Sequence, residues 1–279
     1  MDKLLFAVPG LPLGDGRRKF NYASGIEYVA GLGLDAMELM FVRSVTVTDR
    51  NCMAIRRASA ENDIYLSAHG SYYVNLNSAD PEVVSKSLER LRLGAEGLLK
   101  VGGRRLVFHA GFYQSSSREE AFRNILANLL RLPDLGVEYR IETTGKPSQF
   151  GTVEEICALC LETPFCAPCI DFSHIHARGI GCLKGYADFA RILEYVGGKL
   201  GEGALKELHA HMAGIRYGAK GEICHVPLKE GDFPYADCLK ALYDFDARGV
   251  VVAEGPLVEG DSLLLKETYA GLGHSGRFA

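Results

Sequence analysis

The chain is organised around Cys169-Ile170-Asp171-Phe172-Ser173-His174-Ile175-His176-Ala177-Arg178-Gly179. The apolar run that leads into it, from Pro164 to Ile170, predicts a buried strand that delivers one carboxylate and two imidazoles onto a turn. An unpaired carboxylate in apolar surroundings is costly, whereas aspartate and histidine side chains together bind divalent metal ions well. The stretch therefore predicts a metal site at the carboxyl end of a strand.

Short apolar segments of the same kind recur along the chain, each followed by a glycine or polar turn and then by a helical pattern. They predict eight strands, at Leu4–Pro9, Ala36–Phe41, Ile64–His69, Arg105–Ala110, Glu138–Thr143, Phe165–Asp171, Glu207–Ala213 and Val250–Glu254. Apolar residues at three- and four-residue spacing predict helices between them, at Pro81–Val101, Ser117–Leu130, Thr152–Leu161, Tyr186–Val196 and Tyr235–Phe245. We expect a last helix over Gly255–Tyr269 and a frayed tail over Gly271–Ala279.

Eight strand–helix units in about 250 residues is the count of a closed (β/α)8 TIM barrel. A doubly wound sheet usually has fewer strands, and no GxGxxG phosphate loop follows the first strand. The length of 279 residues also allows two average domains, but no linker rich in proline, glycine and serine divides the chain. We therefore predict a single-domain α/β barrel that spans residues 1–279.

The composition, with 47% hydrophobic and 24% charged residues, is that of a globular protein. The sequence contains no run of eighteen apolar residues and does not open on a signal-peptide pattern. Its eight cysteines are too few for a disulfide-built fold. We therefore expect a cytoplasmic monomer with no membrane partner, and the net charge of −4 requires any nucleic-acid surface to be local.

Polar residues gather where the predicted strands end, at the face where barrel enzymes place their chemistry. The strand ends supply His69, His109, Glu142, Asp171, His211 and Glu254, and the segments beyond them supply His174 and His225. A single histidine at a strand end is usually a hydrogen-bonded core residue. Three carboxylates in one mouth, however, would repel one another and raise each other's pKa values unless divalent ions lay between them. Mixed histidine and carboxylate ligands favour Zn²⁺, Mn²⁺ or Fe²⁺ over Ca²⁺, and two or three ions are expected.

Seven short motifs carry these residues in order: His69-x-Ser71-Tyr72-x-x-Asn75-Leu76, Phe108-His109-x-Gly111, Ile141-Glu142-x-Thr144, Ile170-Asp171-x-x-His174, His211-Met212, His225 before Glu230-Gly231, and Glu254. Together the motifs resemble the endonuclease IV family of abasic-site DNA endonucleases, which belongs to the xylose isomerase-like barrel superfamily. The resemblance implies three zinc ions at the mouth. The implied ligands are His69, His109 and Glu142 for the first ion, Glu142, Asp171, His211 and Glu254 for the second, and His174 and His225 for the third.

The resemblance also implies hydrolysis of double-stranded DNA at abasic sites by a metal-activated hydroxide. The implied catalytic carboxylates are Glu142, Asp171 and Glu254, and the implied substrate-binding residues are Tyr72, Asn75 and Arg43. One position departs from the family, which has an aspartate two residues before the histidine that matches His225. This chain has Ile223 there, and Glu222 and His176 are the nearby candidates to replace the missing acid.

Two other functions stay open at this point. A sugar isomerase or epimerase of the same superfamily would use one or two ions to polarise a hydroxy-ketone while carboxylates move protons. The isoleucine at position 223 favours this function, whereas His174 and His225 favour the nuclease. A metal-bearing binding module without turnover is the third alternative.

Several polar residues have no role in the motifs. His209 shares a strand face with His211 by two-residue alternation, and Glu38 is expected to face the barrel interior, either as the support of a ligand or as a satisfied core carboxylate. The pairs Cys157-x-x-Cys160 and Cys166-x-x-Cys169 lie closer together than in zinc ribbons, and they fall on a helix and a strand. We therefore expect no metal between the two pairs.

Overall fold

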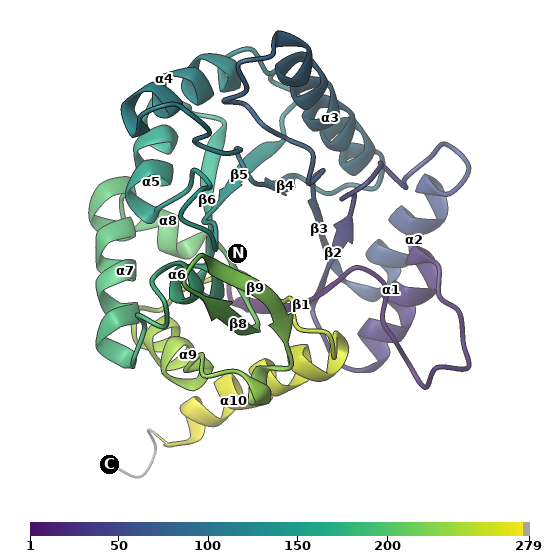
Figure 1. Cartoon of the computed structure of the whole chain (residues 1–279). Helices are drawn as coiled ribbons and strands as arrows, with labels where there is room; N and C mark the ends of the chain where they lie inside the picture. Colours follow the sequence, from purple (N-terminus) through teal and green to yellow (C-terminus); the bar gives the residue numbers. More distant parts are fainter. Residues whose placement is uncertain (276–279) are drawn as a thin grey trace.

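The predicted barrel is confirmed by the computed structural model, which describes residues 1–275. Eight strands, each parallel to its neighbours, close in the order β1-β10-β7-β6-β5-β4-β3-β2 (Figure 1). The bounds of the barrel strands are β1 Leu4–Pro9, β2 Ala36–Met40, β3 Tyr65–His69, β4 Arg105–Phe108, β5 Glu138–Glu142, β6 Cys166–Asp171, β7 Leu208–Met212 and β10 Gly249–Ala253. Each end lies within two residues of its predicted position.

Helices surround the barrel on its outer side (Figure 1). Their bounds are α1 Tyr22–Gly31, α2 Cys52–Asn62, α3 Pro81–Lys100, α4 Arg118–Leu129, α5 Val153–Glu162, α6 Phe172–Arg178, α7 Tyr186–Leu200, α8 Gly203–Lys206, α9 Tyr235–Asp244 and α10 Glu259–Ser275, with a short 3-10 helix at Leu228–Glu230. All five helices predicted from apolar spacing are present. Capping boxes begin two of them, because Ser117 and Thr152 each exchange hydrogen bonds with a glutamate three residues on.

The two sides of the barrel wall differ in character. Between strands and helices the core is apolar, and it includes Leu98 of α3, Phe108 of β4 and Phe189 of α7. Inside the barrel, where branched apolar residues usually dominate, several fully buried side chains are polar. The most polar of them are Glu38, Ser67, Arg140, Glu142, His209 and His211. This polar interior leads directly to the carboxyl ends of the strands, where the predicted ligands lie.

A hairpin at the mouth is the main feature that the sequence analysis missed. No strand was predicted around His225, but this segment forms the antiparallel strands β8 (Gly214–Gly218) and β9 (Gly221–Val226) (Figure 1). The hairpin packs on α6, and the amide of Glu222 donates to the carbonyl oxygen of Gly145 at 2.9 Å, just beyond β5. The hairpin therefore brings β9 to the open end of the barrel.

The turn expected after Asp171 is the first turn of a helix instead. Asp171 is the N-cap of α6, and its Oδ1 accepts a hydrogen bond from the amide of His174 at 2.7 Å. This short cap holds the aspartate and the imidazole of His174 side by side.

The expected tail also needs correction, because α10 continues to Ser275; residues 276–279 lie outside the described part of the chain. Among residues 1–275, no helix is both long and apolar enough to cross a membrane.

Replacement of Gly249 by alanine tests how closely β10 packs on β7. Gly249 has φ +124°, and a Cβ there would lie 2.0 Å from the carbonyl oxygen of Leu208 on β7. Gly249→Ala should lower the free energy of unfolding by more than about 1 kcal/mol, measured by urea denaturation, because an alanine is strained at this φ and collides with backbone. Gly31→Ala is the matched control, since Gly31 ends α1 with open space around it. Equal stability of the two variants would contradict the close packing of β10 on β7.

Candidate metal centre

The structure brings the eight predicted ligands together at the mouth of the barrel. They form three overlapping clusters, in each of which one ligand atom per residue lies within 4.8 Å of the others. These are cluster 1 with His69, His109 and Glu142, cluster 2 with Glu142, Asp171, His211 and Glu254, and cluster 3 with Asp171, His174 and His225. Clusters 1 and 2 have the ligand sets that the resemblance implies, and cluster 3 gains Asp171.

Glu142, at the end of β5, belongs to clusters 1 and 2 and also lies close to His174 of cluster 3. Its Oε2 lies 2.8 Å from His109 Nε2 and 3.0 Å from His69 Nε2. Its Oε1 lies 3.1 Å from His211 Nδ1 and 3.4 Å from His174 Nδ1. Burial raises the pKa of Glu142, but the charges of His109 and His211 outweigh burial and hold the pKa well below its usual value. The carboxylate is therefore ionised, although it is fully buried.

Two buried atoms at the mouth lack a hydrogen-bond partner, and both are potential metal ligands. Asp171 Oδ2 lies 3.1 Å from His174 Nδ1, but that nitrogen bonds to the carbonyl oxygen of Thr143. His225 Nε2 in cluster 3 is also without a partner. Burial raises the pKa of Asp171, and the charges of Glu142 and Glu254 raise it further. A divalent ion would satisfy the orphaned atoms and reduce the repulsion among the carboxylates, so the residues present fit a bound metal.

Three of the histidines are held in the orientation that metal ligation requires. The Nδ1 atoms of His69, His174 and His225 lie 2.9, 2.9 and 3.1 Å from the backbone oxygens of Gly70, Thr143 and Glu254. Because a carbonyl only accepts, Nδ1 carries a proton in each ring, and Nε2 is the nitrogen that can ligate a metal ion once it has no proton of its own. These rings are therefore oriented by the backbone.

Glu222, one of the two candidates to replace the missing acid, lies beside cluster 3. Its Oε2 lies 3.6 Å from His174 Nε2, and its Oε1 lies 4.0 Å from His225 Nε2. Ile223 is 66% exposed and has no partner in the register of the hairpin, where Cys224 pairs with Arg216 and Glu222 with Tyr217. This bulge breaks the two-residue alternation of β9, so Glu222 and His225 reach the same cluster although they are three residues apart.

His176, the other candidate for this role, bonds elsewhere. Its Nε2 lies 3.1 Å from Asp232 Oδ1, and its Nδ1 accepts a hydrogen bond from the amide of Leu183. Tyr217 of β8 donates to the second oxygen of Asp232 at 2.6 Å. His176 and Asp232 therefore fasten the hairpin to α6 and hold Glu222 and His225 over the mouth.

Glu38 lies against the two histidines of β7, inside the barrel. Its Oε2 lies 2.9 Å from His209 Nε2 and accepts from Ser67 Oγ at 2.8 Å, while Oε1 lies 3.1 Å from His211 Nε2. Burial raises the pKa of Glu38, but the charge of His211 and the hydrogen bond from His209 outweigh it and lower the pKa far below its usual value. Glu38 thus supports the His211 imidazole from below, and the Nδ1 atom of that ring faces Glu142.

The three predicted substrate-binding residues lie in different environments. Tyr72 is 58% exposed, and its ring meets the His69 ring edge-on at 5.5 Å between centroids. Arg43 lines a pocket of about 420 Å³ beside the mouth, which Ser71 and Arg90 also line. Asn75 is buried, and its Oδ1 accepts from the amides of Asn77 and Phe112, so it holds the loops at the rim.

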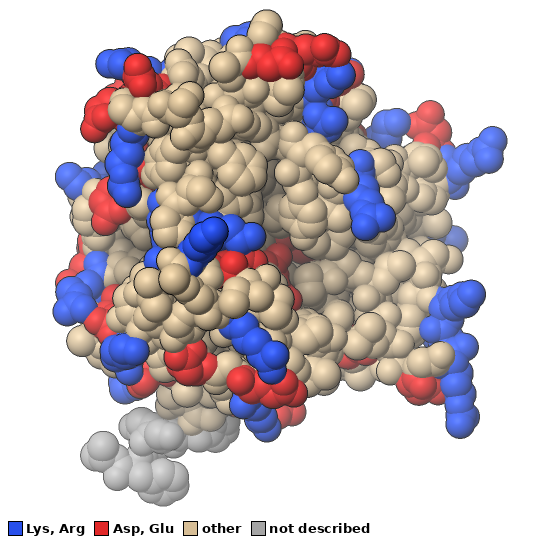
Figure 2. Space-filling view, viewed as in Figure 1, with Lys and Arg blue, Asp and Glu red and all other residues tan. Residues whose placement is uncertain are grey.

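The mouth is visible as a hollow near the centre of the face in Figure 2, with acidic side chains inside it and basic side chains beside it. Acidic side chains therefore attract cations into the hollow, and basic side chains lie beside it. The acidic side chains in the hollow agree with the acidic composition of cluster 2.

Comparison with known proteins identifies relatives over nearly the whole chain. A family model described as "Xylose isomerase-like TIM barrel" matches residues 26–269. An uncharacterized protein of Methanocaldococcus jannaschii is 40% identical over 272 residues, which cover 95% of this chain and 97% of that protein. A protein of Thermoplasma acidophilum named "Probable endonuclease 4" is 29% identical over 130 residues, which cover 46% of each chain.

Solved structures share the architecture at low sequence identity. A D-tagatose 3-epimerase-like protein superposes with a TM-score of 0.73 at 18% identity, over 98% of this chain and 99% of that chain. Endonuclease IV from Thermus thermophilus gives a TM-score of 0.69 at 20% identity, over 97% of this chain and 99% of that chain. At such identities the likeness shows the fold alone. The family match and the full-length relative establish that this chain belongs to the xylose isomerase-like TIM barrel family.

Proposed function

We propose that the protein is a metal-dependent phosphodiesterase that cleaves the DNA backbone at abasic sites, in the manner of endonuclease IV. The observation that supports this function is cluster 3, beside which Glu222 lies because of the bulge at Ile223. The missing aspartate was the main argument for a sugar enzyme with one or two ions, and the Glu222 carboxylate beside His174 and His225 removes that argument. The partial sequence match to an endonuclease 4 supports the same function.

The residues of the three clusters would hold two or three Zn²⁺ ions, or Mn²⁺. Such ions supply Lewis-acid activation of water and neutralise charge on a phosphate and its leaving oxygen. Glu142 belongs to clusters 1 and 2, so its carboxylate links the two sites. Burial raises the pKa of Glu254, but the charge of His211 outweighs it and lowers the pKa to about 2. Glu254 is therefore an anion at neutral pH and, with Asp171, completes the catalytic carboxylates of cluster 2.

The rim of the mouth offers groups that suit an opened DNA strand. Tyr72 and Tyr73 are both more than half exposed, and Arg90 lies 5.6 Å from the centre of the Tyr73 ring. Aromatic rings stack on bases, and arginine side chains bind backbone phosphates. We therefore assign DNA contacts to Tyr72 and Arg43, with Asn75 supporting the loop that carries Tyr72.

A sugar isomerase or epimerase is the second candidate. Cluster 2 by itself has four ligands, enough for one ion, and its carboxylates could also move protons. The two functions are distinguished by incubating metal-loaded protein with an abasic duplex and with a panel of ketoses. EDTA-sensitive incision of the duplex supports the nuclease, and ketose conversion without incision overturns it.

Replacement of Glu142 by glutamine should abolish incision while the fold is retained. Loss of a group that merely supports a metal ligand costs about 10- to 100-fold, so loss of the carboxylate shared by two clusters should cost more than about 100-fold. Incision of an abasic duplex measures the effect, and circular dichroism checks the fold. Glu162→Gln, at the exposed end of α5, is the control. Unchanged incision by Glu142→Gln would contradict the bridging role.

Glu222→Gln should remove about one equivalent of bound metal, since the anionic oxygens beside His174 and His225 are lost. Ile223→Asp should leave the metal content unchanged, because the side chain at position 223 faces solvent. Metal analysis after dialysis measures both variants. An unchanged metal content in Glu222→Gln, together with a gain in Ile223→Asp, would contradict the role of Glu222 and show that position 223 faces the cluster.

Arg43→Ala should weaken binding to an abasic duplex and reduce the slope of log K against log salt by about one, because one phosphate contact is lost. Arg248→Ala is the control, since Arg248 lies at the amino-terminal end of β10, away from the mouth. An identical salt slope for Arg43→Ala and the parent protein would remove Arg43 from the interface.

A further inference from the structure

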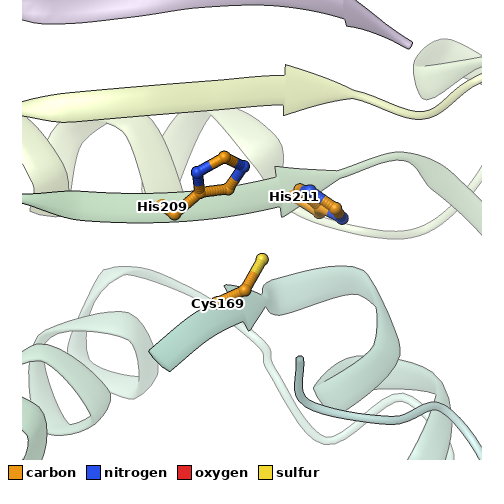
Figure 3. Close-up of side chains that lie close together, drawn as sticks. All are labelled: Cys169, His209 and His211. Atoms are coloured by element: carbon orange, nitrogen blue, oxygen red, sulfur yellow. The ribbon is translucent and has the colours of Figure 1, made fainter. Parts of the chain in front are cut away.

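A fourth group of potential ligands lies below the mouth, within the barrel. Its members are Cys169 on β6 and His209 and His211 on β7, and one ligand atom from each lies within 4.8 Å of the others (Figure 3). We propose that these three residues form an inner metal site for a thiophilic divalent ion such as Zn²⁺ or Co²⁺. The inner site does not depend on the proposed nuclease activity.

The geometry of β6 and β7 brings the three side chains together. His209 and His211 are two residues apart on β7, so both project from the same face of the strand, about 6.6 Å apart along it. Cys169 projects from β6 toward β7 (Figure 3). All three residues are fully buried. The inner site adjoins the mouth, because His211 also belongs to cluster 2.

Unpartnered nitrogen atoms provide an independent sign of a missing ligand. His209 Nδ1 and His211 Nε2 are both buried and have no hydrogen-bond partner. His211 Nε2 lies 3.1 Å from Glu38 Oε1, but without the geometry of a hydrogen bond. Buried polar atoms are rarely left in this state, so two of them beside a thiol point to a cation.

The charges around the inner site suit a divalent ion. On binding, the Cys169 thiol and the His211 imidazolium each release a proton to solvent, which leaves a thiolate and a neutral imidazole, the forms that ligate metal. The ion, the thiolate and the neighbouring Glu38 carboxylate together carry no net charge, which lowers the cost of burying the cation. Glu38 also bonds to His209 Nε2 at 2.9 Å, as carboxylates beside ligating imidazoles do.

The inner site differs from the mouth clusters in the metal that it selects. Of the four ligand groups found among residues 1–275, it alone contains a thiol. Thiolate and imidazole ligands favour Zn²⁺ and Co²⁺ over Mn²⁺, whereas the carboxylate-rich clusters accept all three ions. His211 contributes to the inner site and to cluster 2, so the two sites are coupled through one imidazole.

The experiment is a Co²⁺ titration of the full chain after removal of metal with a chelator. We expect about one equivalent of Co²⁺ to produce a thiolate-to-cobalt charge-transfer band in the near ultraviolet. Cys169→Ser should abolish this band and retain the weaker visible bands of cobalt in the mouth clusters. Cys166→Ser is the matched control on the same strand, since Cys166 projects to the opposite face by three-residue separation. A parallel titration with Mn²⁺ should bind about one equivalent less.

Absence of the charge-transfer band in the parent protein, or its persistence in Cys169→Ser, overturns the inner site. If Cys169→Ser does not fold, His209→Gln decides: an altered or lost band supports the proposal, and an unaltered band overturns it. The spectrum is independent of DNA incision. An inactive protein with the band retains the inner site and refutes the nuclease, and an active protein without the band does the reverse.

Discussion

The contact between the Glu142 carboxylate and four imidazoles is the constraint on which the rest of the site depends. A buried anion is stable only where positive charge or hydrogen-bond donors surround it. Here the donors come from β3, β7, the segment after β4 and α6, which meet only because the barrel closes. Two further carboxylates, Asp171 and Glu254, crowd the same place. Their mutual repulsion makes a cation the natural complement of this arrangement.

The hairpin β8–β9 adds further side chains to the mouth of the barrel in this chain. The Tyr217–Asp232–His176 contacts hold the hairpin on α6, and the bulge at Ile223 turns Glu222 toward His174 and His225. Cluster 3 is thus assembled from an element that inserts between β7 and β10. In the proposed site the acid is Glu222, one position before Ile223, and it reaches the cluster because the bulge shifts the backbone register.

The sequence alone predicted the barrel strands closely, since short apolar runs recur along the chain between helical patterns. It also identified the residues of clusters 1 and 2, because strand ends such as His69 and Glu142 must share one face of the barrel. The bulge at Ile223 could not be predicted, since strand register depends on pairing with Arg216 and Tyr217. The contact between Glu38 and His211 joins β2 to β7 across the barrel and has no signal in local spacing. The helix after Asp171 was missed, although aspartate is a favoured N-cap residue.

The central claim is that cations hold the acidic and imidazole groups together at the mouth. Anomalous X-ray scattering from crystals soaked in zinc tests it most directly, because it locates and identifies ions in one measurement. We expect strong zinc peaks on either side of the Glu142 carboxylate, with a further peak between His174, His225 and Glu222. A mouth without any anomalous peak after the soak would contradict the account.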